Sequence, residues 1–138
     1  MSFEFPFEYG EIDGLGSLFY PIILLELKTT GGWRKFSFLV DTGADITTVP
    51  SHSLPVLGFD KSELETSSTL GVSGYSVKTW EFRLPLRLGT HELLVSASAV
   101  ETKDDSMPLL LGRKDIFGDK FNLLLDSRRK VTVISENI

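Results

Sequence analysis

The sequence predicts a mostly β protein of a single domain, with one or two short helices. The chain has 138 residues, of which 41% are hydrophobic and 24% charged, which is the size and balance of one globular domain. Short apolar stretches alternate with polar residues and are separated by glycine-containing turns, which is the pattern of β-strands. No segment repeats its apolar residues at the spacing of a long helix.

Residues 1–19 are expected to form an N-terminal arm that precedes a domain of residues 20–138. Within the arm, phenylalanines occupy every second position from Phe3 to Phe7, as in a short strand, and Pro6 favours an edge position. Glycines then interrupt the pattern. Two interpretations stay open: the arm lies on the surface of its own domain, or it pairs with a partner chain.

Eight further segments have the alternation or the continuous apolar character of strands. They cover residues 20–28, 33–40, 46–49, 78–88, 92–100, 109–111, 121–125 and 131–134. The sequence Thr-Thr-Gly-Gly at 29–32 predicts a hairpin turn between the first two. Residues 51–58 are expected to form one short helical turn, the polar residues 60–69 a loop, and residues 113–120 a short helix.

A glycine-containing hairpin tip is predicted at residues 70–77. Two glycines, Gly71 and Gly74, lie within it, and alternating sequence flanks them. Glycine permits backbone conformations that other residues avoid, so this tip either flexes or approaches another group closely. An ordinary surface hairpin is the alternative interpretation.

Composition and charge exclude several classes of function. Cysteine is absent, which excludes disulfides, thiolate metal sites and a cysteine nucleophile, and the histidines, His52 and His91, are too few for a histidine-rich metal centre. The net charge of −5 disfavours nucleic-acid binding. No apolar run approaches the roughly 18 residues of a membrane span, and no basic, apolar leader is visible, so we expect a cytoplasmic protein.

The most unusual stretch of the sequence is an apolar run that stops at a carboxylate. Phe38-Leu39-Val40 leads directly into Asp41, and a hydroxyl, a glycine and a second carboxylate follow within four residues. A carboxylate at the edge of a core is costly to ionise unless neighbouring groups hold its charge. The threonine side chain and nearby backbone N–H groups are suited to that task. Asp41 is therefore either a turn residue or a functional group.

The sequence of residues 41–45, Asp-Thr-Gly-Ala-Asp, resembles the signature of the retropepsin-like aspartic proteases. Residues 109–113, Leu-Leu-Leu-Gly-Arg, resemble the family's second signature, and the glycine hairpin lies between the two, where the family has its flap. The resemblance covers roughly residues 20–134. It implies an acid-protease-like closed β-barrel or sandwich with a flap hairpin, which forms a homodimer and hydrolyses peptides.

The resemblance also fits the chemistry of carboxylate-catalysed hydrolysis. Such hydrolysis needs two carboxylates that share a proton, one as base toward water and one as acid toward the carbonyl oxygen. The chain has 19 acidic residues but only one Asp-Thr-Gly, at Asp41. The second carboxylate is therefore expected from Asp41 of another copy across a two-fold axis. No metal and no other cofactor is expected.

The resemblance implies a role for each residue of the first signature. Asp41 would be the catalytic carboxylate, and Thr42 would bond the neighbouring backbone across the dimer. Gly43 would let the backbone approach the substrate, and Ala44 would leave the cleft floor open. Asp45 would bond the substrate main chain.

The remaining roles fall on the second signature and on the hairpin. Arg113, which follows Gly112, would pair with Asp45 and so support it. The flap tip would consist of Val72, Ser73 and Gly74, although these residues differ from those of the viral members, and it would close over a bound peptide. The extended peptide would carry apolar side chains near the scissile bond.

Two further interpretations compete with a constitutively active homodimeric endopeptidase. The chain would otherwise be a non-catalytic dimeric β-domain, a peptide-binding or dimerisation module on a protease-like fold. It would alternatively be a dormant enzyme gated by residues 1–19, which the shorter viral members lack. The substrate itself is not encoded in any motif that we recognise.

Overall fold

The computed structural model describes residues 1–70, 74, 76–102 and 106–137 of the chain. Within these residues it contains twelve strands and two short 3₁₀ helices, which confirms a mostly β fold. The strands are β1 (Ser2–Pro6), β2 (Glu8–Ile12), β3 (Gly16–Tyr20), β4 (Ile22–Thr29), β5 (Gly32–Val40), β6 (Thr47–Pro50), β7 (Glu65–Leu70), β8 (Ser76–Leu88), β9 (His91–Val100), β10 (Leu109–Leu111), β11 (Phe121–Asp126) and β12 (Val131–Glu136). The 3₁₀ helices are η1 (Ser51–Ser53) and η2 (Lys61–Glu63).

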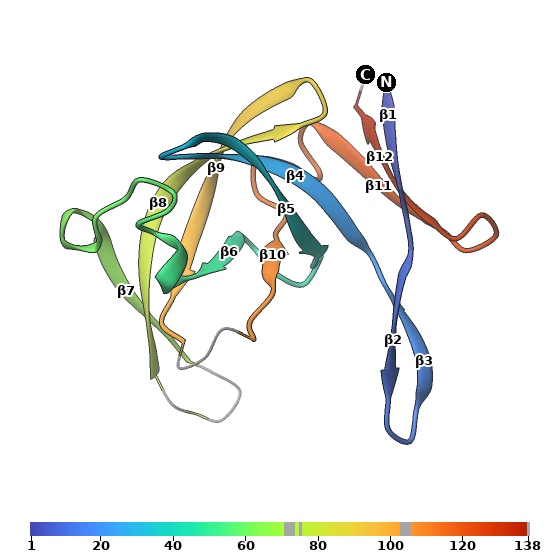
Figure 1. Ribbon diagram of the computed structural model, residues 1–138, viewed down its shortest axis with the longest axis horizontal. Helices are drawn as coiled ribbons and strands as arrows, with labels where there is room; N and C mark the ends of the chain where they lie inside the picture. The colour runs from blue at the N-terminus through green and yellow to red at the C-terminus, as the bar shows by residue number, and fades with distance from the viewer. Residues whose placement is uncertain (71–73, 75, 103–105, 138) are drawn as a thin grey trace.

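Seven strands form a sheet that closes into a barrel (Figure 1). Their order is β4-β5-β10-β6-β9-β8-β7, and an additional pairing between β4 and β8 closes the ring. That closure is antiparallel and joins Glu26 to Arg87 and Leu27 to Leu86. Closure removes the exposed edges that β4 and β8 would otherwise present, and β7 extends beyond the ring as a flanking strand.

The barrel encloses an apolar core because alternate residues of each strand point inward. Leu25 and Leu27 of β4, Phe38 of β5, and Leu84 and Leu86 of β8 are all at most 2% exposed. Burying each such side chain contributes about 1.5–3 kcal/mol. The period-two alternation of the sequence thus places the apolar side chains inside the barrel, where their burial stabilises the fold.

The short strand β10 positions the two signature segments side by side. It lies between β5 and β6, and its pairing with β5 is parallel, with Leu110 opposite Leu39 and Leu111 opposite Val40. Both strands therefore end at the same edge of the sheet. The residues that follow them, Asp41 and Gly112, are brought together although 70 positions separate them in sequence.

The chain termini meet in a second sheet of three strands, ordered β1-β12-β11. β1 is an edge strand, as Pro6 predicts, and it pairs antiparallel with β12, so that Phe3 lies opposite Ile134. Phe7 is buried and stacks on Phe19, with ring centroids 4.2 Å apart. The division into an arm of residues 1–19 and a domain of residues 20–138 stays a prediction.

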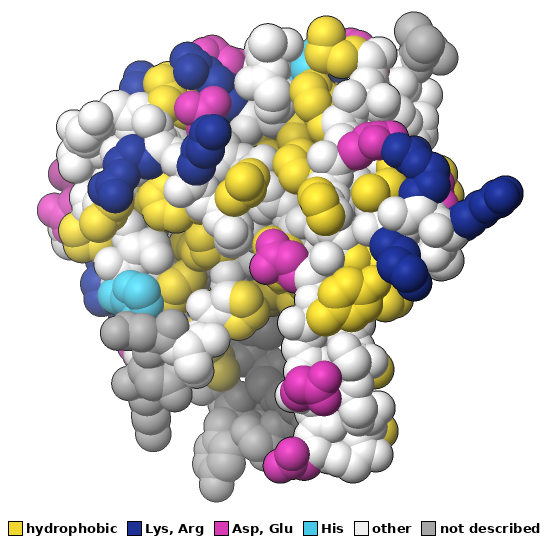
Figure 2. All heavy atoms as spheres, turned by 45° about the vertical axis from the view of Figure 1, so that its right-hand side comes forward, with side chains coloured by type: hydrophobic (Ala, Val, Ile, Leu, Met, Phe, Trp, Pro, Cys, Tyr) yellow, Lys and Arg dark blue, Asp and Glu magenta, His cyan; other side chains and the backbone are white. Residues whose placement is uncertain are grey.

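A two-stranded hairpin, β2–β3, projects from the body of the molecule (Figure 1). Figure 2 shows it standing out, with acidic and apolar side chains on its surface, while Lys and Arg side chains gather over the β11–β12 turn. Tyr9 and Leu15 of the hairpin are 54% and 68% exposed. The base of the hairpin lies next to the end of β5, because the Val40 N–H donates to the Pro21 carbonyl at 3.0 Å.

Three expectations about local structure were wrong. The segment 60–69 is not a loop, because η2 and β7 occupy most of it and β7 pairs with β8. The segment 113–120 forms turns and not a helix, because Asp115 (φ 68°) and Gly118 (φ 79°) adopt left-handed conformations. The single strand expected at 20–28 is interrupted at Pro21, between β3 and β4.

Within the described ranges, no helix has the length and apolar character that a membrane crossing would require.

Candidate active site

Asp41 lies directly after β5, half-buried at the edge of the barrel. Its N–H donates to the carbonyl of Leu111 at 3.0 Å, and its own carbonyl accepts from the Ala44 N–H at 3.1 Å. Its carboxylate oxygen Oδ1 accepts from the N–H of Gly43 at 3.0 Å. The backbone thus holds the carboxylate in one orientation, and charge-assisted hydrogen bonds of this kind are the stronger ones.

Gly43 has a steric reason to lack a side chain. A Cβ at this position would lie 3.3 Å from Oδ1 of Asp41, a tight contact that would crowd the carboxylate. Thr42 and Gly43 are exposed in the single chain. They present a polar backbone turn beside the carboxylate.

Gly112 is required by a close approach between two backbones. An added Cβ would lie 2.3 Å from the carbonyl carbon of Ile46, a distance that folded proteins do not tolerate. The N–H of Gly112 donates to the hydroxyl of Thr47 at 3.2 Å, and Thr47 is fully buried. The second signature therefore packs directly against Ile46 and Thr47, the residues that follow the first signature.

Asp45 and Arg113 form the ion pair that the sequence predicts. The main chain reinforces the pair, because the Arg113 N–H donates to the Ala44 carbonyl at 3.1 Å and the Lys114 N–H donates to the Asp45 carbonyl at 2.9 Å. The two side chains are 86% and 51% exposed in the single chain, so the pair contributes little to stability by itself. The ion pair and these main-chain bonds join the residues that follow Asp41 to the second signature.

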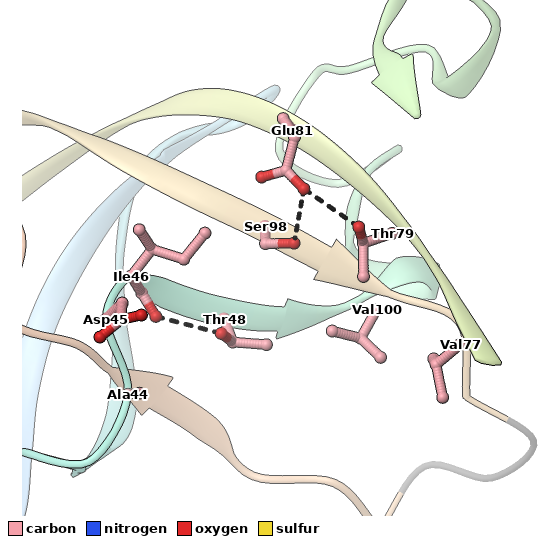
Figure 3. Close-up of a pocket in the computed structure, with 9 residues that line it drawn as sticks. All are labelled: Ala44, Asp45, Ile46, Thr48, Val77, Thr79, Glu81, Ser98 and Val100. Atoms are coloured by element: carbon pink, nitrogen blue, oxygen red, sulfur yellow. Dashed lines mark hydrogen bonds between the residues drawn. The ribbon is translucent and has the colours of Figure 1, made fainter. Parts of the chain in front are cut away.

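A cleft of about 580 Å³ opens beside this loop (Figure 3). It is lined by Ala44, Asp45, Ile46, Thr48, Val77, Thr79, Glu81, Ser98 and Val100. Ala44 and Asp45 come from the predicted signature, whereas the other residues come from the strands β6, β8 and β9 and from Ile46 just before β6. The lining is a mixture of aliphatic, hydroxyl and carboxylate side chains.

Sequence interpretation missed the second carboxylate of this cleft, Glu81. Its Oε1 accepts from the hydroxyl of Thr79 at 3.0 Å and from the hydroxyl of Ser98 at 3.3 Å. A signal was present: on β8, Val77, Thr79 and Glu81 share the face opposite to that of the buried Trp80 and Phe82. A strand whose second face carries two polar groups is a candidate for a cleft wall.

The predicted flap falls partly outside the described residues. Val72 and Ser73 belong to the part that the structure does not describe. Gly74 has φ 83°, a left-handed conformation that favours glycine. The strands on both sides of the tip pair as a hairpin, with Leu70 opposite Ser76. Gly74 does not contribute to the lining of the cleft.

Among residues 1–70, 74, 76–102 and 106–137, no group of three His, Asp or Glu side chains forms a candidate metal centre.

The fold is that of the retropepsin-like aspartic proteases. The structure is similar to that of a retropepsin-like aspartic protease from Rickettsia conorii, with a TM-score of 0.65 and 20% sequence identity over 97% of this chain and 91% of that one. It is also similar to the EIAV protease solved with an inhibitor, with a TM-score of 0.53 and 18% identity over 68% of this chain and 82% of that one. The first match thus includes most of the N-terminal strands.

The sequence itself matches the family model described as aspartyl protease over residues 26–114, which is more than half of the chain. The chain therefore belongs to the aspartyl protease family. The matched range includes both signatures, from Asp41 to Arg113. A search of curated proteins found no match.

Proposed function

We propose that the protein is a homodimeric aspartic endopeptidase whose two Asp41 carboxylates, one from each subunit, activate a water molecule. The observation that carries this proposal is the geometry of Asp41. Its carboxylate is held by the Gly43 N–H at 3.0 Å, stands at the end of a barrel strand, and adjoins a cleft through Ala44 and Asp45. One chain supplies one such carboxylate, and the chemistry needs two.

In the proposed mechanism the two carboxylates share one proton, since two like charges about 3 Å apart do not both ionise readily. The ionised carboxylate takes a proton from water as the water attacks the peptide carbonyl carbon. The protonated carboxyl gives its proton to the carbonyl oxygen. When the tetrahedral intermediate collapses, the C–N bond breaks and the leaving nitrogen takes the proton that the first carboxylate received from water, while a hydroxyl of the intermediate returns its proton to the other carboxylate.

The other signature residues would position the carboxylates and the substrate. Thr42, exposed in the single chain, would bond the partner's backbone and hold the two loops together. The Gly43 carbonyl would accept a substrate N–H. Asp45, oriented by Arg113, would bond the substrate main chain. The flap residues Val72, Ser73 and Gly74 would close over the peptide and exclude water.

Peptide or protein chains in extended conformation are the proposed substrates, because strands line the cleft and pair naturally with an added strand. Nucleic acid and membranes are not proposed as partners. A cytoplasmic location and the absence of a cofactor stay predictions from the sequence.

Cleavage by Asp41→Asn compared with the wild type tests the catalytic proposal. We expect the wild type to cleave a broad library of extended peptides between about pH 4 and pH 7, and Asp41→Asn to lose at least about a thousandfold in kcat/KM, because no carboxylate dyad remains. Asp119→Asn, which removes an exposed carboxylate outside the cleft, is the matched control. Cleavage that survives Asp41→Asn would refute the assignment.

Sedimentation at several protein concentrations tests the dimer. We expect activity to appear over the same concentration range as the dimer, because the single chain holds half of the dyad. A dimer that binds peptides without cleaving any of them would favour a non-catalytic β-domain. An active monomer would contradict the shared-site mechanism. Removal of residues 1–19 without any rise in activity would argue against gating by this segment.

A further inference from the structure

The cleft beside Asp41 has an unbalanced negative charge. Of the described residues that line it, two carry charges, Asp45 and Glu81, and both are acidic. Asp45 is paired with Arg113. Within residues 1–70, 74, 76–102 and 106–137, no such ion pair involves Glu81. The cleft thus offers a carboxylate that no described basic residue neutralises.

Two hydroxyl groups hold Glu81 in a fixed orientation. Both the Thr79 and the Ser98 hydroxyls donate to the same oxygen, Oε1, and these residues are only 3% and 5% exposed. Figure 3 shows the other carboxylate oxygen directed away from the two hydroxyls. Because both buried donors engage Oε1, Oε2 is available to a further donor, and no described residue donates to it.

The surroundings of Glu81 would suit the stem of a long basic side chain. Ile46, Val77 and Val100 line the same cleft with aliphatic surface. Lysine and arginine bury their methylene groups along apolar surface while the charged end reaches a polar group. An apolar wall with one oriented carboxylate therefore fits these side chains better than it fits a purely apolar one.

The nearest basic side chain on the same strand face is already committed elsewhere. Arg83 donates to the Ser96 hydroxyl at 2.9 Å and to the Leu94 carbonyl at 3.0 Å, and it lies 3.6 Å from Asp115. The residue opposite Glu81 on β7 is another carboxylate, Glu65. Lys114 lines the adjacent groove together with Glu65 and Glu81, but it does not line the cleft.

We propose that this cleft is a specificity subsite for a lysine or arginine side chain of an extended peptide, with Glu81 as the specificity-determining residue. The proposal rests on the proposed function for the location of the peptide, but it requires only that the cleft binds one. To the expected apolar side chains near the scissile bond it adds a preference for one basic side chain.

Paired peptides provide the test. Each position of a cleaved sequence is occupied in turn by lysine, arginine, norleucine, glutamine or glutamate, and kcat/KM is measured for the wild type, Glu81→Gln, Glu81→Lys and the control Asp119→Asn. Binding of the same peptides to Asp41→Asn is measured in parallel, so that the result does not depend on catalysis. Glu81→Gln keeps an oxygen that accepts from Thr79 and Ser98, and so it isolates the charge.

We expect the wild type to prefer lysine or arginine over norleucine at one position by roughly two- to fivefold, as for a partly exposed ion pair. Glu81→Gln should abolish this preference, Glu81→Lys should shift it toward glutamate, and Asp119→Asn should leave it unchanged. A preference that persists in Glu81→Gln, or a wild type that neither cleaves nor binds basic peptides better, overturns the inference. Absence of cleavage with selective binding by Asp41→Asn overturns the proposed function alone.

Discussion

Replacement of Gly112 by alanine should destabilise the fold by about 3 kcal/mol. The added Cβ would lie 2.3 Å from the Ile46 carbonyl carbon, 2.5 Å from its oxygen and 2.8 Å from the Thr47 nitrogen. The shortest distance is about 1 Å less than an ordinary van der Waals contact, and the obstructing atoms are backbone, so the strands must separate. Overpacking costs about 1–3 kcal/mol, and loss of the bond from Gly112 to Thr47 about 1 kcal/mol more.

Urea unfolding followed by tryptophan fluorescence and circular dichroism measures this change, since Trp80 is only 5% exposed and reports on the barrel. Protein concentration is held fixed, because a dimer couples stability to concentration. Gly31→Ala is the matched control: its Cβ would meet its nearest atom at 3.9 Å, and it should change the free energy of unfolding by less than about 1 kcal/mol. A Gly112→Ala variant as stable as Gly31→Ala would refute the argument from close packing.

Three further outcomes follow from described contacts. Thr47→Val should cost about 1–3 kcal/mol in urea unfolding, because it leaves the Gly112 N–H buried without its acceptor, whereas Thr47→Ser should cost less. The Ser96 N–H, which donates to the Asp115 carboxylate, holds the pKa of Asp115 below its ordinary value of 3.8. This contact therefore stabilises the fold above that pH, and the stabilisation is lost as the pH falls through the lower pKa of the folded state. Asp115→Asn should therefore reduce the dependence of the free energy of unfolding on pH in the acid range. Phe3→Ala should reduce the free energy of unfolding by about 2 kcal/mol and lower the thermal midpoint, because the Phe3 ring packs against Gly89 and meets the His91 ring in a T-shaped contact. An unchanged midpoint would show that this contact of β1 does not stabilise the fold.

Strands with strict alternation were predictable because their burial pattern is a local property. The segments at 33–40, 78–88 and 92–100 correspond closely to β5, β8 and β9. The turn at 29–32 was also predictable, since Thr29 pairs with Gly32 across a two-residue connection. In these three strands the local order of apolar and polar residues determines which face is apolar.

The errors arose where tertiary pairing overrides local character. The segment 60–69 is polar and resembles a loop, yet its second half becomes β7 because the edge of β8 offers hydrogen-bond partners. The segment 113–120 has helical composition, but the Asp115 carboxylate bonds the backbone of Ser96, and that contact accompanies a left-handed conformation that ends any helix.

The sequence by itself predicted the family and, through that resemblance, the pairing of Asp45 with Arg113, because these depend on short motifs with their own chemistry. The catalytic role of Asp41 stays a prediction. Only the tertiary structure showed that Glu81 accepts hydrogen bonds from Thr79 and Ser98 and that the Gly112 N–H donates to Thr47. The contacts of Glu81 with Ser98 and of Gly112 with Thr47 join segments that are distant in sequence, and their geometry depends on register and on the closure of the barrel. A one-residue shift in register would turn Glu81 to the opposite face, and no local pattern specifies that register completely.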